Sequence, residues 1–411
     1  MTILVSRRGW LAAFVSAVLA LSAAPATASP ANDFFAAFRH EIEAGYFARP
    51  GVDVAAILDR EETALASDCA SDPDCAVEMG AQAAQRAIAA FGDPHTHVDP
   101  PTQATSASPP VGPVGSASRL GWLVRAYKPT GDLYVSWVRP DSPADRAGLQ
   151  RYDRILGSSL TATQLTSATQ PLTLQIERAG RRFDVQLTPA AQTLGGPTPE
   201  LARVGDVAII RYPSGATAGS AQTVHDLVAE AISQKATGIV LDLRDNGGGG
   251  IQCAGAGAAF FDWTVVMTDK DADQRTLTVT STGAIMHSAD GDESLVIDRP
   301  TRWTGPLAIL VNRNTASCAE AIAIQASLAE RATIIGEPSV GVGNNVVRPA
   351  MLPGGWRLSM ATAYATTPDG APLPSRPRLD VEVADDPISN GATGRDPALA
   401  AAVASLSQTA D

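Results

Sequence analysis

A serine that stands between an apolar segment and a predicted helix is the first residue of this chain whose position suggests chemistry. Ser317 follows the apolar run 306–312 and a short polar turn, and the next residue, Cys318, begins a segment of helical composition. A helix N-terminus presents unpaired amides and a partial positive charge, both of which stabilise an anion. The serine can be a nucleophile, but serine at this position also serves as an ordinary helix N-cap.

A glycine-rich turn supplies a possible partner for the serine. Residues 245–250, DNGGGG, directly follow the apolar segment 238–244, and glycines let the backbone approach a ligand closely. Amides of Gly248 or Gly249 and of Cys318 would then form an oxyanion hole for a tetrahedral intermediate on the serine. A phosphate-binding loop is the other use of such a turn, but no GK[ST] follows and the dinucleotide spacing is absent.

The elements around these two turns alternate between strands and helices. Apolar strands are predicted at 204–212, 238–244 and 306–312, and helices at 218–234 and 318–330. Continuous apolar strands separated by helices are typical of a buried, mainly parallel sheet with helices packed on it. Sites in such sheets lie at the carboxyl ends of strands, where both turns are found.

The N-terminus has the pattern of an export signal. Two arginines, Arg7 and Arg8, precede an apolar run, and small residues end it at Ala26–Thr27–Ala28. This is typical of a signal peptide, and SRRGWL at 6–11 also resembles a twin-arginine signal. We therefore expect a periplasmic or secreted protein, and no later stretch reaches the ~20 apolar residues of a membrane helix.

The net charge of the chain disfavours some classes of binding partner. The chain has a formal net charge of −12, which becomes −14 once the two arginines of the signal are removed. An acidic surface argues against nucleic acid and anionic lipid as partners.

The composition changes along the chain divide it into several domains. Alanine- and glutamate-rich sequence with helical spacing is followed by a stretch rich in Pro, Ser and Thr, then by short alternating strands, then by the strand and helix alternation. The prediction is a signal peptide (1–28), an N-terminal helical domain (29–98), a linker (99–118), a small β domain (119–190), the α/β core (200–385) and a C-terminal segment (386–411).

Four cysteines in an exported chain suggest disulfides. Cys69 and Cys75 flank a turn-rich spacer, so we predict a local bridge between them. Cys253 follows the glycine turn and Cys318 follows the serine, so the fold would bring both near the oxyanion site. They either form a disulfide between the two loops or remain buried thiols.

The small β domain resembles a PDZ domain. The resemblance rests on Gly148, Leu149 and Asp153 at the end of a short helix, and on the segment Leu120, Gly121, Trp122 and Leu123 in the place of the carboxylate-binding loop and its strand. PDZ domains bind an extended peptide at a strand edge. A small β-sandwich that only packs on the core is the alternative.

The motifs LDLRDNGGG, LVNRNTASCAEA and RATIIGEPSVGVG together resemble the tail-specific, or C-terminal-processing, serine peptidase superfamily with its tricorn-core and interphotoreceptor-retinoid-binding relatives. The resemblance implies an α/β multidomain fold with a crotonase-like catalytic core and an inserted PDZ-like domain. It also implies that Ser317 is the nucleophile, Glu320 an acid beside it, and Asp242 and Arg244 charges at the end of the preceding strand.

The sequence departs from this superfamily at the general base. Tail-specific peptidases use a lysine 25 residues after the serine, a position occupied here by Val342, and no lysine follows Ser317 at all. An unassisted serine hydroxyl is a poor nucleophile. In the tricorn branch a histidine ending the helical domain is the base, and FGDPHTHVDP places His95 at that position. The alternative is a structural histidine that caps a turn.

The group that orients this histidine is not evident in the sequence. The tricorn-like branch has a C-terminal acid, but APLPSRPRLDVEV retains only Asp380 and has Leu373 or Pro374 where the acid would fall. His97 should point away from His95 in an extended segment. A metal site made by the two histidines is not favoured, because a helical segment precedes them.

We therefore predict an exported serine endopeptidase without cofactor or metal, acting on peptides or unfolded protein tails through Ser317, His95 and Glu320. The alternative is an inactive relative that binds a peptide or a hydrophobic ligand. The oligomeric state stays open.

Overall fold

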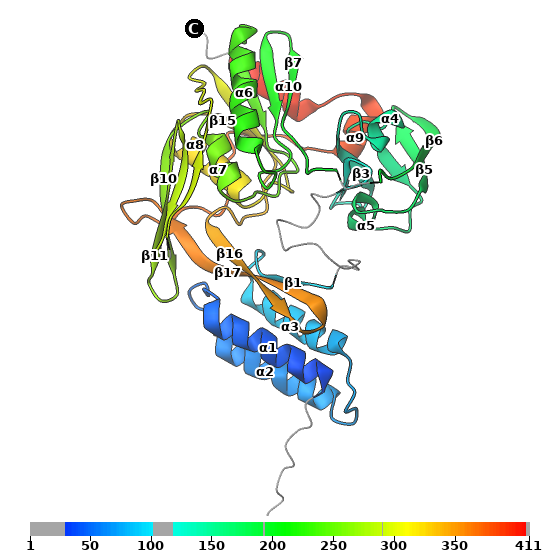
Figure 1. Cartoon of the computed structure of the whole chain (residues 1–411), viewed down its shortest axis with the longest axis vertical. Helices are drawn as coiled ribbons and strands as arrows, with labels where there is room; N and C mark the ends of the chain where they lie inside the picture. Colours follow the sequence, from blue (N-terminus) through cyan, green and yellow to red (C-terminus); the bar gives the residue numbers. More distant parts are fainter. Residues whose placement is uncertain (1–28, 102–117, 192–193, 290, 408–411) are drawn as a thin grey trace, which may run out of the picture.

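The computed structural model describes residues 29–101, 118–191, 194–289 and 291–407. The predicted signal peptide and most of the predicted linker lie outside the described residues. Figure 1 shows a helical unit at one end, an α/β core at the other, and a small β unit beside the core.

Three helices form the N-terminal unit: α1 (Pro30–Gly45), α2 (Val54–Asp68) and α3 (Val77–Phe91). Ser29 and Asp53 cap the first two helices, because their side chains accept the free amides of the first turn. Helical spacing puts Phe34, Phe35 and Phe38 of α1 on one buried face. The predicted disulfide between Cys69 and Cys75 is confirmed and ties the end of α2 to the start of α3.

A long hairpin connects this helical unit to the core. Its strands are β16 (Asn345–Leu352) and β17 (Trp356–Thr366), and Figure 1 shows it reaching from the core to α1. The short strand β1 (His97–Asp99), which follows the helices, pairs antiparallel with β17. Residues of β16 and β17 share a hydrophobic cluster with the helices. The segment that ends the helical unit is therefore fixed directly to a strand of the core.

The core is built on a six-stranded sheet. Its order is β18 (Val381–Glu382), β15 (Thr333–Gly336), β14 (Leu307–Val311), β9 (Gly238–Asp242), β8 (Val207–Arg211) and β7 (Glu200–Val204). All neighbours pair parallel except β7 and β8. The prediction of a mainly parallel sheet in a mixed α/β fold is confirmed.

Helices cover both faces of this sheet. Alternate residues of a strand face opposite sides, and Ile210 and Leu241 join one cluster with helices α6 (Ser220–Ser233), α7 (Ile251–Gly257) and α8 (Cys318–Leu328). Ile209 and Val240 join another cluster with α10 (Pro397–Ser407). The segment after residue 386 thus completes the core, and it also contains α9 (Pro387–Thr393).

A second sheet flanks the core helices. Strands β10 (Trp263–Asp269), β11 (Gln274–Thr280), β12 (Gly283–His287) and β13 (Glu293–Val296) form an antiparallel meander, and β10 also pairs with β17. This second sheet therefore links the core to the long hairpin.

The small β unit is a five-stranded antiparallel sheet. Its strands are β2 (Trp122–Ala126), β3 (Leu133–Val138), β4 (Arg154–Leu156), β5 (Leu172–Arg178) and β6 (Arg181–Leu187), with short helices α4 (Pro143–Arg146) and α5 (Ala162–Thr166). It has its own hydrophobic cluster around Leu120, Trp122 and Ile176. None of the helices in the described ranges is long and apolar enough to cross a bilayer.

Candidate active site

The glycine turn and the serine turn lie against each other. They follow the neighbouring parallel strands β9 and β14, and the amide of Ala316 donates to the carbonyl of Asn246 at 2.9 Å. Gly248 has φ 92°, and a Cβ on it would lie 2.7 Å from the Cβ of Ser317 and 2.9 Å from the amide nitrogen of Cys318. Only a glycine at this position lets the two turns approach so closely.

The backbone of Ser317 is strained. Its φ of 56° and ψ of −128° lie in a region that residues other than glycine rarely adopt, at a cost of about 1–3 kcal/mol. A sharp strand-to-helix turn of this kind exposes the nucleophile in α/β hydrolases. The Ser317 residue is only half-buried, so a substrate carbonyl can reach it.

Two amides beside Ser317 are available to an oxyanion. The amide of Gly248 donates to Oδ1 of Asn246 at 2.8 Å, so this predicted donor is already used by the chain. Within the described ranges, the amides of Gly249 and Cys318 have no acceptor. Of the two glycines left open by the sequence, Gly249 is therefore the one with a free donor, and Gly248 supplies the close approach.

Glu320 anchors the loop beside Ser317. Its carboxylate is fully buried and accepts the amides of Ser317 at 3.0 Å and Val342 at 2.9 Å. It also accepts the amide of Gly341 at 2.6 Å and the hydroxyl of Ser339. Burial raises the pKa of Glu320, and these four donors counter the rise. These contacts leave Glu320 without any hydrogen bond to His95 in the described structure.

A disulfide joins the helices that follow the two turns. Cys253 in α7 is bonded to Cys318 at the start of α8, so of the two alternatives left open by the sequence the disulfide is the one that forms. The bond fixes the residue after the serine to the helix that begins at the end of the glycine turn.

His95 is held by its own loop and by β16. Its amide donates to Oδ1 of Asp93 at 3.0 Å, and Oδ2 of the same carboxylate accepts the hydroxyl of Thr96. The ring nitrogen Nδ1 lies against Oδ1 of Asn345. Burial lowers the pKa of His95, while the contact with Asn345 raises it in part. No hydrogen bond joins the His95 ring to the Ser317 hydroxyl in the described part of the chain.

The other positions considered around this histidine make no hydrogen bond to its ring, although His97 Nδ1 lies 3.1 Å from the His95 carbonyl oxygen. His97 is exposed, with its ring toward Asp99. The carboxylate of Asp380 accepts the amide of Ile334 in β15 and does not contact His95. Leu373 is buried in the core cluster. No group of three potential metal ligands is found among the described residues.

Val342 occupies a position close to the serine backbone. It is 1% exposed, and its amide shares the oxygen Oε2 of Glu320 with the amide of Ser317. Val342 thus lies close to the backbone of Ser317, and its own side chain is a hydrocarbon.

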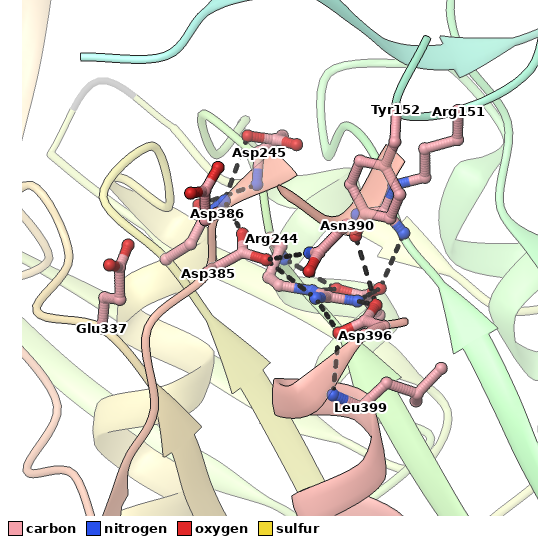
Figure 2. Close-up of polar contacts among 12 residues, drawn as sticks. Arg151, Tyr152, Arg244, Asp245, Glu337, Asp385, Asp386, Asn390, Asp396 and Leu399 are labelled. Atoms are coloured by element: carbon pink, nitrogen blue, oxygen red, sulfur yellow. Dashed lines mark hydrogen bonds and ion pairs between the residues drawn. The ribbon is translucent and has the colours of Figure 1, made fainter. Parts of the chain in front are cut away.

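A buried ion-pair cluster supports the end of β9. Figure 2 shows Arg244 beside Asp385 and Asp396 of the C-terminal segment, to which it donates at 3.0 and 2.9 Å. Arg244 also donates at 2.8 Å to Asp242, the last residue of β9. Arg151 of the small β unit adds a contact to Asp242 at 2.9 Å. Burial would raise the pKa of Asp242, but the two guanidinium groups hold it well below its usual range.

The small β unit contacts both turns of the site. Tyr134 donates to the carboxylate of Asp245, the residue before the glycine turn, at 2.7 Å. Lys128 donates to the carbonyl of Arg313, in the turn before Ser317, at 2.8 Å. A cavity of ≈ 200 Å³ also lies at this interface, lined by Trp137, Arg211 and other residues but not by Ser317.

The predicted carboxylate-binding segment of this unit is occupied by the chain itself. The amides of Leu120 and Gly121 both donate to the hydroxyl of Ser118 at 3.1 Å. Trp122 is fully buried and its indole donates to the carbonyl of Leu165, while Leu123 is nearly buried. A peptide carboxylate could use the two amides only if Ser118 moved.

A known protein family resembles the core of this chain. Residues 206–382 match the model of Peptidase family S41. This segment is therefore similar to peptidase family S41. Ser317, the glycine turn, Val342 and Asn345 all lie within the S41 segment, whereas His95 precedes it.

Relatives of the S41 segment include processing proteases. The carboxyl-terminal-processing protease of Synechocystis sp. is 28% identical over 285 residues, covering 64% of this chain and 61% of that protein. The chloroplastic C-terminal processing peptidase of Tetradesmus obliquus is 27% identical over 292 residues, covering 64% and 58%. The photosystem II D1 C-terminal processing protease has a TM-score of 0.50 at 18% identity, covering 89% and 97% of the two chains, and so shares the fold. The chain thus spans less than two thirds of the length of these two curated relatives.

Proposed function

We propose that this protein is an exported serine endopeptidase that cleaves peptides or protein C-terminal tails. The observation that carries the proposal is the strained backbone of Ser317, which is packed against the glycine turn while the amides of Gly249 and Cys318 have no acceptor in the described structure. Strain at a partly exposed serine persists where the surrounding structure imposes it, and such sites are commonly functional. The names of the S41 relatives support protein tails as the substrate class.

In this mechanism Ser317 Oγ attacks the scissile carbonyl carbon, and its proton passes to Nε2 of His95. The carbonyl oxygen becomes an oxyanion that accepts hydrogen bonds from the amides of Gly249 and Cys318. His95 then gives the proton to the leaving amine, and water hydrolyses the acyl-enzyme ester by the same steps. The ring and the hydroxyl are not hydrogen-bonded without substrate, and such contacts commonly tighten only in the complex.

A non-catalytic, peptide- or hydrophobic-ligand-binding relative is the second candidate. Two observations favour it: Val342 stands in place of the superfamily's lysine, and no described hydrogen bond joins Ser317 to His95. In that case the polar contacts of the small β unit to both turns serve to hold a binding surface.

A peptidase assay with an unfolded protein substrate separates the two candidates. Wild type is compared with Ser317→Ala and His95→Gln, after thermal unfolding has shown that all three are folded. The proposal expects a fall in kcat of about 10⁴-fold or more for Ser317→Ala and a large loss for His95→Gln. Equal rates in all three proteins would rule out this mechanism.

A further inference from the structure

Asn345 is the residue that meets the ring of His95. It begins β16, it is 8% exposed, and its Oδ1 lies against Nδ1 of His95. An amide oxygen only accepts hydrogen bonds, so the facing ring nitrogen must carry the hydrogen. In neutral imidazole this leaves Nε2 with a free lone pair. Within the described ranges Nε2 of His95 has no hydrogen-bond partner.

The rest of the histidine is already positioned, so the orientation of the ring is what Asn345 determines. Asp93 fixes the amide of His95 and the hydroxyl of Thr96, and that hydroxyl accepts the amide of Ala361 in β17 at 3.0 Å. Asn345 pairs with Tyr364 of the same strand β17. The loop of His95 and the residue Asn345 are therefore both anchored to strand β17.

The segment that contains Asn345 also contacts the surroundings of Ser317. Asn345 comes three residues after Val342, whose amide shares the carboxylate of Glu320 with the amide of Ser317. One short segment thus shares a carboxylate with the backbone of Ser317 and places a hydrogen-bond acceptor beside the ring of His95. Asp380 does not contact the His95 ring, whereas Asn345 of this segment does.

We propose that Asn345 is a positioning residue that holds His95 as the Nδ1–H tautomer, with Nε2 available to accept the proton of Ser317. This inference rests on the proposed function and deepens it. A histidine oriented by asparagine is one of the convergent forms of the catalytic triad. A neutral amide fixes the tautomer but stabilises the charged ring less than a carboxylate does.

The titration of His95 follows from its surroundings. Asp93 and His97, both on its own segment, are the titratable groups that act on the ring, and β16 contributes the uncharged amide. Replacing Asn345 by aspartate puts a negative charge against the ring, which favours the protonated form. The pH dependence of activity therefore reports the contact.

The test combines histidine ¹⁵N NMR with kinetics on wild type, Asn345→Leu, Asn345→Asp and the control Asn344→Leu. Asn344 is the adjacent residue and donates to the carbonyl of Leu373 rather than to His95. His95→Gln assigns the resonance. Wild type and the control should show Nδ1–H, and Asn345→Leu should lose this tautomer and about 10- to 100-fold in kcat/KM. Asn345→Asp should keep the tautomer and move the acid limb of kcat/KM upward by about one pH unit or more.

An Nε2–H tautomer in wild type, an unchanged tautomer in Asn345→Leu, or an unmoved pH profile in Asn345→Asp would overturn the inference. Failure of the proposed function is a separate result. It would appear as activity that does not depend on Ser317, whereas the NMR tautomer would still decide whether Asn345 orients the ring.

Discussion

A Cβ added to Gly248 would lie 2.7 Å from the Cβ of Ser317. The glycine turn and the turn that carries Ser317 are therefore packed so closely that position 248 has no room for a side chain. The amide of Gly248 is committed to Asn246, so this glycine acts through its lack of a side chain rather than as a donor.

Gly248→Ala should push the two turns apart and reduce kcat/KM by about 10²-fold or more, as expected when an oxyanion donor is displaced. Gly247→Ala is the matched control, because a Cβ on Gly247 meets nothing within 4 Å. Both variants are measured in the peptidase assay together with their thermal unfolding. Equal activity of the two variants would contradict the close packing described here.

The acid limb of the pH profile should lie below pH 6.5. Burial lowers the pKa of His95 from its usual 6.5, and the neutral ring is the proton acceptor. Activity should therefore rise as pH increases through this lowered pKa and stay level at neutral pH. The measurement is kcat/KM between pH 4 and 9, and a rise centred above pH 8 would point to a different base.

Glu320→Gln should destabilise the protein by about 1.5–3 kcal/mol, because hydrogen bonds to a charged group are lost and the new amide hydrogens face other donors. The control is Glu330→Gln, at an exposed position just after the end of helix α8. It should change the free energy of unfolding by less than about 0.5 kcal/mol. Urea unfolding of both variants gives the comparison. A stable Glu320→Gln protein would mean that the carboxylate does not hold the loop.

Arg244→Met should cost about 3–5 kcal/mol in the free energy of unfolding, since it leaves Asp242, Asp385 and Asp396 without their buried partner. Arg378→Met removes a guanidinium that is 82% exposed and paired with Asp380, and an exposed pair contributes about 0–1 kcal/mol. Similar unfolding curves for the two variants would show that the cluster in Figure 2 contributes little.

The sequence was most informative where local patterns decide the structure. The apolar strands that precede the turns of Gly248 and Ser317 predicted that the two turns would meet, because parallel strands end at one edge of a sheet. The spacer between Cys69 and Cys75 predicted their bridge. Both inferences needed only neighbouring residues and one general rule of sheet topology.

Contacts between segments that are far apart in the sequence could not be predicted from it. Asn345 and His95 are 250 positions apart, and an asparagine at the start of a strand carries no signal of its partner. The use of the Gly248 amide by Asn246, and of the Leu120 and Gly121 amides by Ser118, depends on side-chain rotamers within turns. Composition and spacing do not specify such contacts.

Covalent labelling with a serine-directed fluorophosphonate tests the central claim most directly. The reagent forms a stable bond to a serine hydroxyl only when a base and an oxyanion site activate it. Mass spectrometry of the digested protein should find one adduct, on Ser317, that disappears in Ser317→Ala and is strongly reduced in His95→Gln. An unlabelled wild-type protein, or labelling that persists in Ser317→Ala, would contradict the account.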